Sequence, residues 1–238
     1  VKSEPKSKAK KSKNKGSEAV SEVKVPSPCS APAAVNKVKV PSSQSQAPVR
    51  TWQYDMCGHT KGVVDYYCKL ANVDKKTLRM VKTPTVDDHE INANDLETRG
   101  TLAAEAASIV LKALYTARMN RPDIYFAVNV LAREVTRWTR ACDERLHRLI
   151  CNVWEFRDDI MSGWVGDSPA DLTIHSFFDV DFAGCPFTLR STSGLHFDAQ
   201  APNSRFPLSS CCNWQTSLTY STTEADLVAA DFVVKTKG

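Results

Sequence analysis

A run of alternating residues in the last third of the chain limits the fold more than any other feature. Residues 172–179 read LTIHSFFD, a series of β-branched and aromatic residues with a period of two, which is the pattern of a β-strand. Gly184 and Pro186 then interrupt the run, as such residues do at turns. A second β-like run, RSTSGLHF, begins at Arg190. The sequence therefore predicts an antiparallel hairpin.

Two carboxylates lie at the end of the first predicted strand. Asp179 and Asp181 are two residues apart, so on a strand both side chains point to the same face. Such acids are either solvated at a sheet edge, which is the commoner case, or gathered around a divalent metal ion, because hard cations such as Mg²⁺ prefer oxygen ligands. The two acids alone leave both interpretations open.

Short strands followed by a helix are expected after Gly166. The helix begins at Ser221 or Thr222, either of which can cap it, and Glu224 falls in its first turn. The expected strands are Leu172–Asp179, Ser191–Asp198 and Phe206–Ser210, with a further short β run at Ser217–Tyr220.

The middle of the chain predicts helices, because its apolar residues recur at spacings of three and four. Pro122 suits the first turn of one of them. Residues 78–100 lack this periodicity and predict an extended connector. The expected helices lie within His59–Val73, over Thr101–Met119, from Pro122 to Val135, and over Ala141–Phe156.

Five arginines leave one side of the last two of these helices basic. Such a surface can hold the phosphates of a nucleic-acid duplex, or it can be the solvated face of two amphipathic helices. The five are Arg133, Arg137, Arg140, Arg145 and Arg148.

Residues 1–50 differ in composition from the rest of the chain. They hold eleven of the 31 Lys and Arg residues against three Glu, and no aromatic residue. Such a segment buries too little apolar surface to offset chain entropy, so we expect a disordered tail. It can bind polyanions through its lysines, or it can be a plain linker, which we favour slightly.

The composition also indicates a cellular location. The eight cysteines show no paired framework, which is typical of reduced thiols in an intracellular protein of the cytoplasm or nucleus. No apolar run reaches the roughly 18 residues of a membrane span, and no signal peptide is visible. A chain that begins with Val1 is expected to be a fragment.

Three motifs in order carry a resemblance to a known family. FFDVDFAG, RSTSG and STTEADLVAA together resemble the ribonuclease H domain at the end of copia-type retrotransposon Pol polyproteins. Upstream, LKALYTARMNRPDIYFAVNVLAREVTRWT is similar to the segment that joins reverse transcriptase to ribonuclease H. The resemblance runs from Thr51 to the end of the chain.

The resemblance implies an α+β fold in three parts. Residues 1–50 would be a disordered linker, and residues 51–165 the mostly helical end and connection of the reverse transcriptase. Residues 166–238 would be a truncated ribonuclease H-like domain of three antiparallel strands and the first helix. Such a domain lacks its later strands, so we expect an open sheet edge and a C-terminal half less stable than the helices. Its aromatic residues Phe177, Phe178, Phe182 and Trp214 would lack partners.

The chemistry implied is hydrolysis of the RNA strand of an RNA–DNA hybrid with two Mg²⁺ ions. By resemblance, Asp179 is the first acid and Asp226 stands where the family has a second acid, a Glu. Both would be catalytic residues and metal ligands. The helical arginines, together with Arg190, would contact nucleic acid.

The chain also departs from the family pattern. Asp226 is one methylene shorter than the family's Glu, and misplacing a reacting group by about 1 Å can cost roughly a hundredfold in rate. Asn213 and Trp214 replace two lysines, and the family's third and fourth acids would follow Gly238. The Tyr-x-Asp-Asp signature of a polymerase is missing. We therefore expect little or no ribonuclease H activity, and the alternative function is non-catalytic nucleic-acid binding through the tail and the arginine-rich helices.

Overall fold

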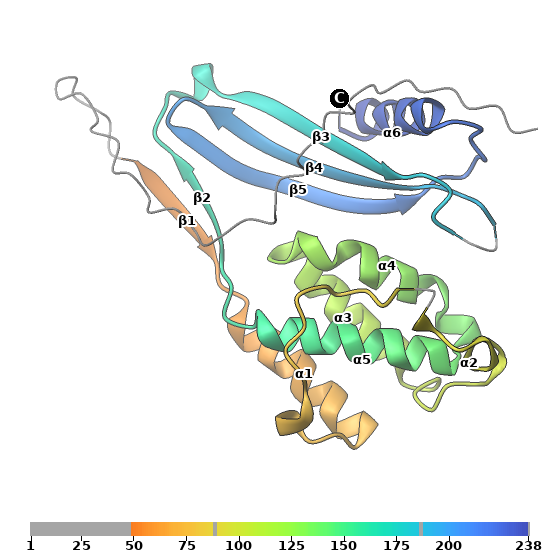
Figure 1. Ribbon diagram of the computed structural model, residues 1–238. Coiled ribbons are helices and arrows are strands. Elements are labelled where there is room, and N and C mark those ends of the chain that lie inside the picture. Colours follow the sequence, from red (N-terminus) through yellow and green to blue (C-terminus); the bar gives the residue numbers. More distant parts are fainter. Residues whose placement is uncertain (1–48, 88–89, 186–187, 238) are drawn as a thin grey trace, which may run out of the picture. The chain divides into compact units, whose positions relative to one another are not determined.

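The computed structural model describes residues 49–87, 90–185 and 188–237, all within one unit of the chain, Ser45–Gly238 (Figure 1). These residues form six α-helices and one five-stranded antiparallel sheet with the strand order β1-β2-β5-β4-β3. The predicted α+β class is confirmed. The predicted disordered tail lies outside the described residues, apart from its last two positions.

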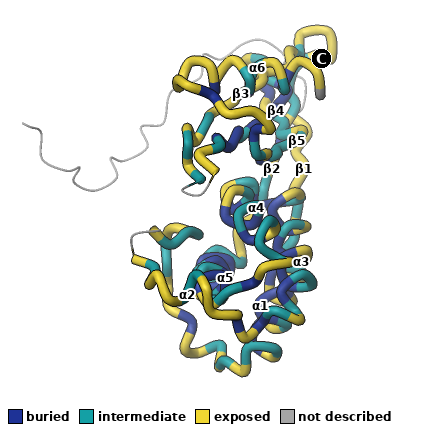
Figure 2. The backbone as a smooth tube through the Cα atoms, turned by 90° about the vertical axis from the view of Figure 1, so that its right-hand side faces the viewer, coloured by how far each residue is buried: buried dark blue, intermediate teal, exposed yellow. Residues whose placement is uncertain are grey.

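Four helices share one apolar core, namely α1 (Cys57–Ala71), α3 (Ala106–Met119), α4 (Tyr125–Arg133) and α5 (Arg140–Glu155). A fifth, short helix, α2 (Ala93–Glu97), buries no residue, and short 3₁₀ turns lie at Lys75–Thr77, Pro122–Ile124 and Val135–Arg137. Ile109, Val128 and Leu146 are fully buried members of this core. The buried stretches of α3 and α5 are dark blue in Figure 2. Apart from α2, which interrupts the expected connector, and the start of α3, these helices confirm the positions predicted from periodicity.

The helix expected from Thr101 begins five residues later than predicted. The carboxylate of Asp143 on α5 accepts hydrogen bonds from the backbone N–H and the hydroxyl of Thr101, at 2.6 and 2.9 Å, and from the indole N–H of Trp138 at 2.7 Å. These bonds hold residues 101–105 in turns against α5. An apolar stripe in the sequence does not reveal such a distant acceptor.

The Arg-Pro-Asp-Ile segment has a structural role. Arg121 is 5% exposed, and its guanidinium donates to both carboxylate oxygens of Asp123, at 2.8 and 2.6 Å. It also donates to Asn152 Oδ1 at 3.0 Å and to the backbone carbonyl of Phe156 at 3.2 Å. Arg121 thus ties the start of the 3₁₀ turn at Pro122 to the end of α5.

The predicted hairpin is confirmed and extended. Strands β3 (Thr173–Asp181) and β4 (Thr192–Ala201) pair along their whole length, and β4 pairs with β5 (Ser204–Trp214) with a register shift at Phe197/Asp198. The β run expected at Ser217–Tyr220 is wrong. The Thr219 hydroxyl lies 3.3 Å from that of Ser191, and the Tyr220 N–H donates to Glu224, so this segment leads into helix α6 (Thr222–Lys237).

Two further strands were not predicted from the sequence. Strand β1 (Arg50–Tyr54) pairs with β2 (Met161–Val165), and β2 joins the sheet where Trp164 pairs with Arg205. The expectation of three strands is therefore corrected to five. Each of the two is only five residues long, and they lie more than a hundred residues apart, so no local pattern reveals the pairing.

The two faces of the sheet carry different layers. Leu195 and Phe197 of β4 pack with Val233 of α6, so alternate residues of these strands face α6. The opposite face lies toward α4, where the Asn129 amide donates to the backbone carbonyl of Cys212 at 2.7 Å (Figure 1). Strand β3 ends the sheet, as expected for an open edge, and Phe177, Phe178 and Phe182 are 37–48% exposed.

Candidate nucleic-acid interface

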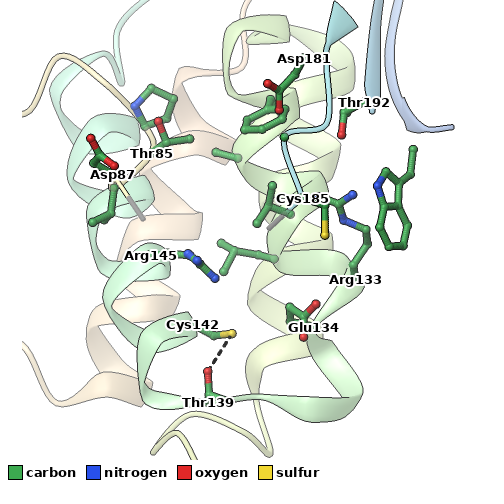
Figure 3. A pocket seen from close by; sticks show the side chains of 18 of the residues that line it. Thr85, Asp87, Arg133, Glu134, Thr139, Cys142, Arg145, Asp181, Cys185 and Thr192 are labelled. Atoms are coloured by element: carbon green, nitrogen blue, oxygen red, sulfur yellow. Dashed lines mark hydrogen bonds between the residues drawn. The ribbon is translucent and has the colours of Figure 1, made fainter. Parts of the chain in front are cut away.

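A hollow of about 890 Å³ lies between α4, α5, the segment 84–87 and the ends of β3–β5 (Figure 3). Its walls carry two kinds of side chain. Apolar ones come from α2, α4 and the 84–87 segment, and charged ones come from α4, α5, the turn between them, the 84–87 segment and the end of β3. The apolar lining includes Val86, Leu96, Phe126, Val130 and Leu131, and the charged lining consists of Asp87, Arg133, Glu134, Arg137, Arg145 and Asp181.

Arg133 and Trp214 form one wall of this hollow. Arg133 lies in the last turn of α4, where a cation is favoured by the helix dipole. Its guanidinium carbon stands 4.6 Å from the centre of the Trp214 ring, and that of Arg190 stands 5.3 Å from the same ring. Such cation–π contacts are favourable. Trp214 therefore has partners, contrary to the expectation from sequence.

Two donors in this wall have no hydrogen-bond partner among the described residues. They are the buried atoms Nη1 of Arg133 and Nε1 of Trp214. A buried donor without an acceptor costs roughly 1–3 kcal/mol. Native structures keep few such groups, and each calls for an explanation.

Arg145 faces this wall from the other side. It extends from α5 into the hollow, across from Arg133 and Cys185 (Figure 3). Arg137 lines the same hollow, with a side chain that is 78% exposed and 3.5 Å from the Glu134 carboxylate. Three of the five helical arginines thus gather at one place.

The other two helical arginines do not line this hollow. Arg140 lies 3.5 Å from the Asp95 carboxylate of α2. Arg148 donates to the Thr83 carbonyl at 3.2 Å and to its hydroxyl at 2.7 Å. The five arginines therefore do not form the single basic side expected from sequence. The connector and α2 pack along α5, where they contact Arg148 and Arg140.

The predicted acid Asp179 lies on the sheet face toward α4. It pairs with Gly194 in the register and lines a second hollow of about 630 Å³, which also contains Asp181 and Phe126. One Asp179 oxygen accepts a hydrogen bond from the Val180 N–H at 2.9 Å. The two acids share one face, as their spacing indicates.

The predicted acid Asp226 belongs to the layer on the other side of the sheet. It is exposed on α6, whose buried row of Ala225, Ala229 and Val233 packs on β3 and β4. Glu224 is engaged at the start of α6, where its backbone N–H donates to the Ser221 hydroxyl at 3.1 Å. Ser221 is therefore the cap of this helix.

These placements decide how the acids fit a pair of Mg²⁺ ions. Asp179 lies on β3 and faces α4, whereas Asp226 lies on α6, which packs on the other face of the sheet. A two-metal site needs several carboxylates converging on ions about 4 Å apart. The part of the chain that the structure describes holds no group of three or more His, Cys, Asp or Glu residues able to bind a metal. The donor set present does not fit two ions, and we derive no metal-dependent step from it.

A buried thiol adjoins the same face. Burial raises the pKa of Cys212 on β5 to about 11, so this thiol stays protonated at neutral pH. The seven cysteines within the described residues are all free thiols.

The wall made by Trp214 was missed by reasoning from sequence. The sequence marked Trp214 as the replacement of a family lysine and as an aromatic residue expected to lack partners. The predicted strand ends at Ser210, whereas β5 runs to Trp214 and places it two residues from the buried Cys212, on the same face. Neither the longer strand nor the packing of its face against α4 could be read from the sequence.

The comparisons with known proteins give one match. The chain is 33% identical over 86 residues to a protein of Arabidopsis thaliana described as the uncharacterized mitochondrial protein AtMg00810. The match covers 36% of this chain, and the chain spans about a third of that protein (35%). No family model and no solved structure matches. Among the described residues, every helix is too short or too polar to span a lipid bilayer. The chain is thus a distant relative, over about a third of its length, of an uncharacterized plant mitochondrial protein.

Proposed function

We propose that this chain is a segment derived from a copia-type retrotransposon Pol polyprotein and that it binds nucleic acid without cleaving it. The observation that carries the proposal is the gathering of Arg133, Arg137 and Arg145 around one hollow, with Arg190 on the adjoining Trp214 ring. Arginine donors of this kind bind the phosphates of either strand without reading sequence.

The mixture of charges in the hollow limits the affinity expected for nucleic acid. Asp87, Glu134 and Asp181 line it together with the arginines, so it is not a uniformly positive surface. A long duplex laid across it would meet repulsion as well as attraction. We therefore expect moderate affinity that falls steeply with salt, because the attraction comes from a few phosphate contacts.

Hydrolysis of an RNA–DNA hybrid is the second candidate. The order of the three motifs and the strand–strand–strand–helix arrangement of β3, β4, β5 and α6 favour it. The separation of Asp179 and Asp226 into two layers counts against it. In this candidate, Asp179 would be the first catalytic acid and Mg²⁺ the cofactor.

The test of binding uses the full chain and a fluorescently labelled RNA–DNA hybrid. A lysine-rich tail can bind polyanions by itself, so every variant is compared in a background in which the seven lysines of residues 1–15 are replaced by Gln. In that background we expect the double variant Arg133→Gln/Arg145→Gln to bind more weakly and to lower the salt slope by about 2, or about 1 for each lost phosphate contact. The matched control is Arg118→Gln, which changes an exposed arginine outside the hollow. Equal salt slopes for all three proteins would refute the proposal.

The test of hydrolysis uses the same hybrid with added Mg²⁺ or Mn²⁺. We expect no cleavage above background. Cleavage that is abolished by Asp179→Asn would overturn the non-catalytic proposal and establish the second candidate.

A further inference from the structure

We infer that the hollow between α4, α5 and the strand ends receives one unpaired nucleotide of a bound strand. This inference rests on the proposed function and names the form of nucleic acid that the site takes. It predicts a preference for strands with unpaired ends over blunt duplexes.

The size of the hollow fits a nucleotide better than a lone phosphate. Its volume of about 890 Å³ lies within the range of roughly 300–1,000 Å³ typical of sites for small organic ligands. A phosphate group held by two arginines would leave most of it empty. A nucleotide adds a ring and a sugar to the phosphate and fills more of the space.

The walls of the hollow have an apolar part and a charged part, which correspond to the base and the phosphate of a nucleotide. Phe126 of α4 lines the hollow and is 37% exposed, although it is a large aromatic residue, and Val130 lies one turn further along α4. Arg133 and Arg145 approach from opposite sides. An exposed aromatic ring stacks a base without regard to its identity, and the arginines suit a phosphate.

The unpartnered donors support the phosphate end. Nη1 of Arg133 and Nε1 of Trp214 both donate and cannot accept, and both are buried without an acceptor among the described residues. A phosphate oxygen entering beside them supplies acceptors after a small rotation of the Arg133 side chain. A water molecule or an apolar ligand would satisfy this donor pair less well, because neither carries negative charge.

An unpaired base is required because the stacking surface lies inside the hollow. A base in a duplex has both faces covered by its neighbours, and removing it from the stack costs energy. A base in a single-stranded end has a free face. The site therefore favours overhangs and single strands over blunt duplexes.

The experiment uses the full chain in which the seven lysines of residues 1–15 are replaced by Gln, and it measures binding to three labelled probes of one sequence. The probes are a blunt RNA–DNA hybrid, the same hybrid with a short single-stranded DNA overhang, and the single DNA strand. We expect the overhang probe to bind about tenfold more tightly than the blunt hybrid, since stacking of one base on an aromatic ring is worth about this much. Phe126→Leu, which retains an apolar side chain, is expected to remove that preference, and Arg133→Gln to weaken binding of all three probes.

A control variant and measurements of folding distinguish loss of the binding site from loss of the fold. Tyr220→Leu removes an aromatic residue that is 93% exposed and lies outside the hollow, and it should leave the preference unchanged. Circular dichroism and thermal unfolding of each variant report the fold. Equal affinity of the parent chain with the replaced tail lysines for blunt and overhang probes, or a preference that persists in Phe126→Leu, would overturn the inference while leaving the proposed function intact. Failure of that parent chain to bind any probe would refute the proposed function and the inference together.

Discussion

The helical region, α1–α5, and the sheet region, β3–β5 with α6, are stabilised to different degrees. Twenty-two buried apolar residues form one connected core among the helices and the turns between them. The connected core between the sheet and α6 contains three, namely Leu195, Phe197 and Val233, and the other buried residues of α6 are the small Ala225 and Ala229. Apolar burial is the main favourable term in folding, so the helical region has the larger share of the stability.

Hydrogen bonding follows the same division. In the helical region Arg121 and Asp143 each make several bonds to segments distant in sequence. Strand β3 forms the open edge of the sheet, with backbone donors and acceptors on one side outside the strand ladder. The helical region is therefore expected to be more stable than the sheet region.

The largest expected effect comes from emptying the helical core. Leu146 is completely buried on α5, so Leu146→Ala should cost about 3–5 kcal/mol of unfolding free energy, the upper range for buried leucines. Leu195→Ala removes the same atoms from the small core under α6 and should cost about 2 kcal/mol, near the lower end. Urea denaturation measures both.

The control for this pair is Leu111→Ala, whose side chain is 63% exposed on α3, with an expected change within about 0.5 kcal/mol. If Leu195→Ala proved as costly as Leu146→Ala, the comparison between the two regions would be wrong.

A smaller loss is expected from Arg121→Met, which leaves acceptors of Asn152 and Phe156 without their donor. Asp123 stays half exposed and can be solvated, so the cost should be about 2 kcal/mol, typical of lost buried hydrogen bonds. Thermal or urea unfolding measures it, and Arg118→Met serves as the exposed control. Because Arg121 is structural, nucleic-acid affinity per folded molecule should not change. A selective loss of affinity with unchanged stability would show that Arg121 belongs to the binding surface.

A pH dependence is expected from the helical region. Burial lowers the pKa of His147 below its ordinary value of 6.5, and its Nδ1 lies 2.9 Å from the Tyr67 hydroxyl. As the pH falls below 6.5, the unfolded chain takes up a proton that the folded chain resists, so this stability, full above pH 6.5, declines through the folded-state pKa.

The measurement is the urea midpoint at pH 7.5 and at pH 5.5. The wild type should lose stability at the lower pH, and His147→Gln should lose less. An identical decline in the variant would assign the effect to other groups.

The smallest effect on stability is expected at the open edge. Ile174 on β3 is 62% exposed, so Ile174→Lys should change the unfolding free energy by no more than about 0.5 kcal/mol. A lysine on an edge strand discourages pairing with other chains, so aggregation measured by light scattering should fall. Leu218→Lys, on a loop and 54% exposed, is the matched control. Equal improvement from both variants would indicate a general effect of charge, not of the edge.

Hydrogen exchange extends the same comparison to the backbone. Amides of α5 should remain protected longer than those of β3, because regions with few buried apolar contacts open at lower cost. Equal protection of the two elements would contradict the expected weakness of the C-terminal half.

Elements with a strong local pattern were predicted well from sequence. Helix α5 follows an uninterrupted apolar stripe, and the β3–β4 hairpin follows a period of two bounded by Gly184 and Pro186. Strands β1 and β2 were missed because each is short and gains its stability from a partner distant in the chain. The start of α3 was placed too early because its limit is set by Asp143 from another helix.

The sequence predicted some residues of the candidate site but not how they are arranged in space. The sequence by itself determined the α+β class, the hairpin with Asp179 and Asp181 on one face, and the supply of arginines on the last two helices. Only the tertiary structure decided that Arg133 and Arg145 meet across a hollow while Arg140 and Arg148 bind elsewhere, and that Trp214 completes one wall. The physical reason is that periodicity records which face of an element is apolar, whereas the neighbour of each charged side chain depends on how separate elements pack against one another.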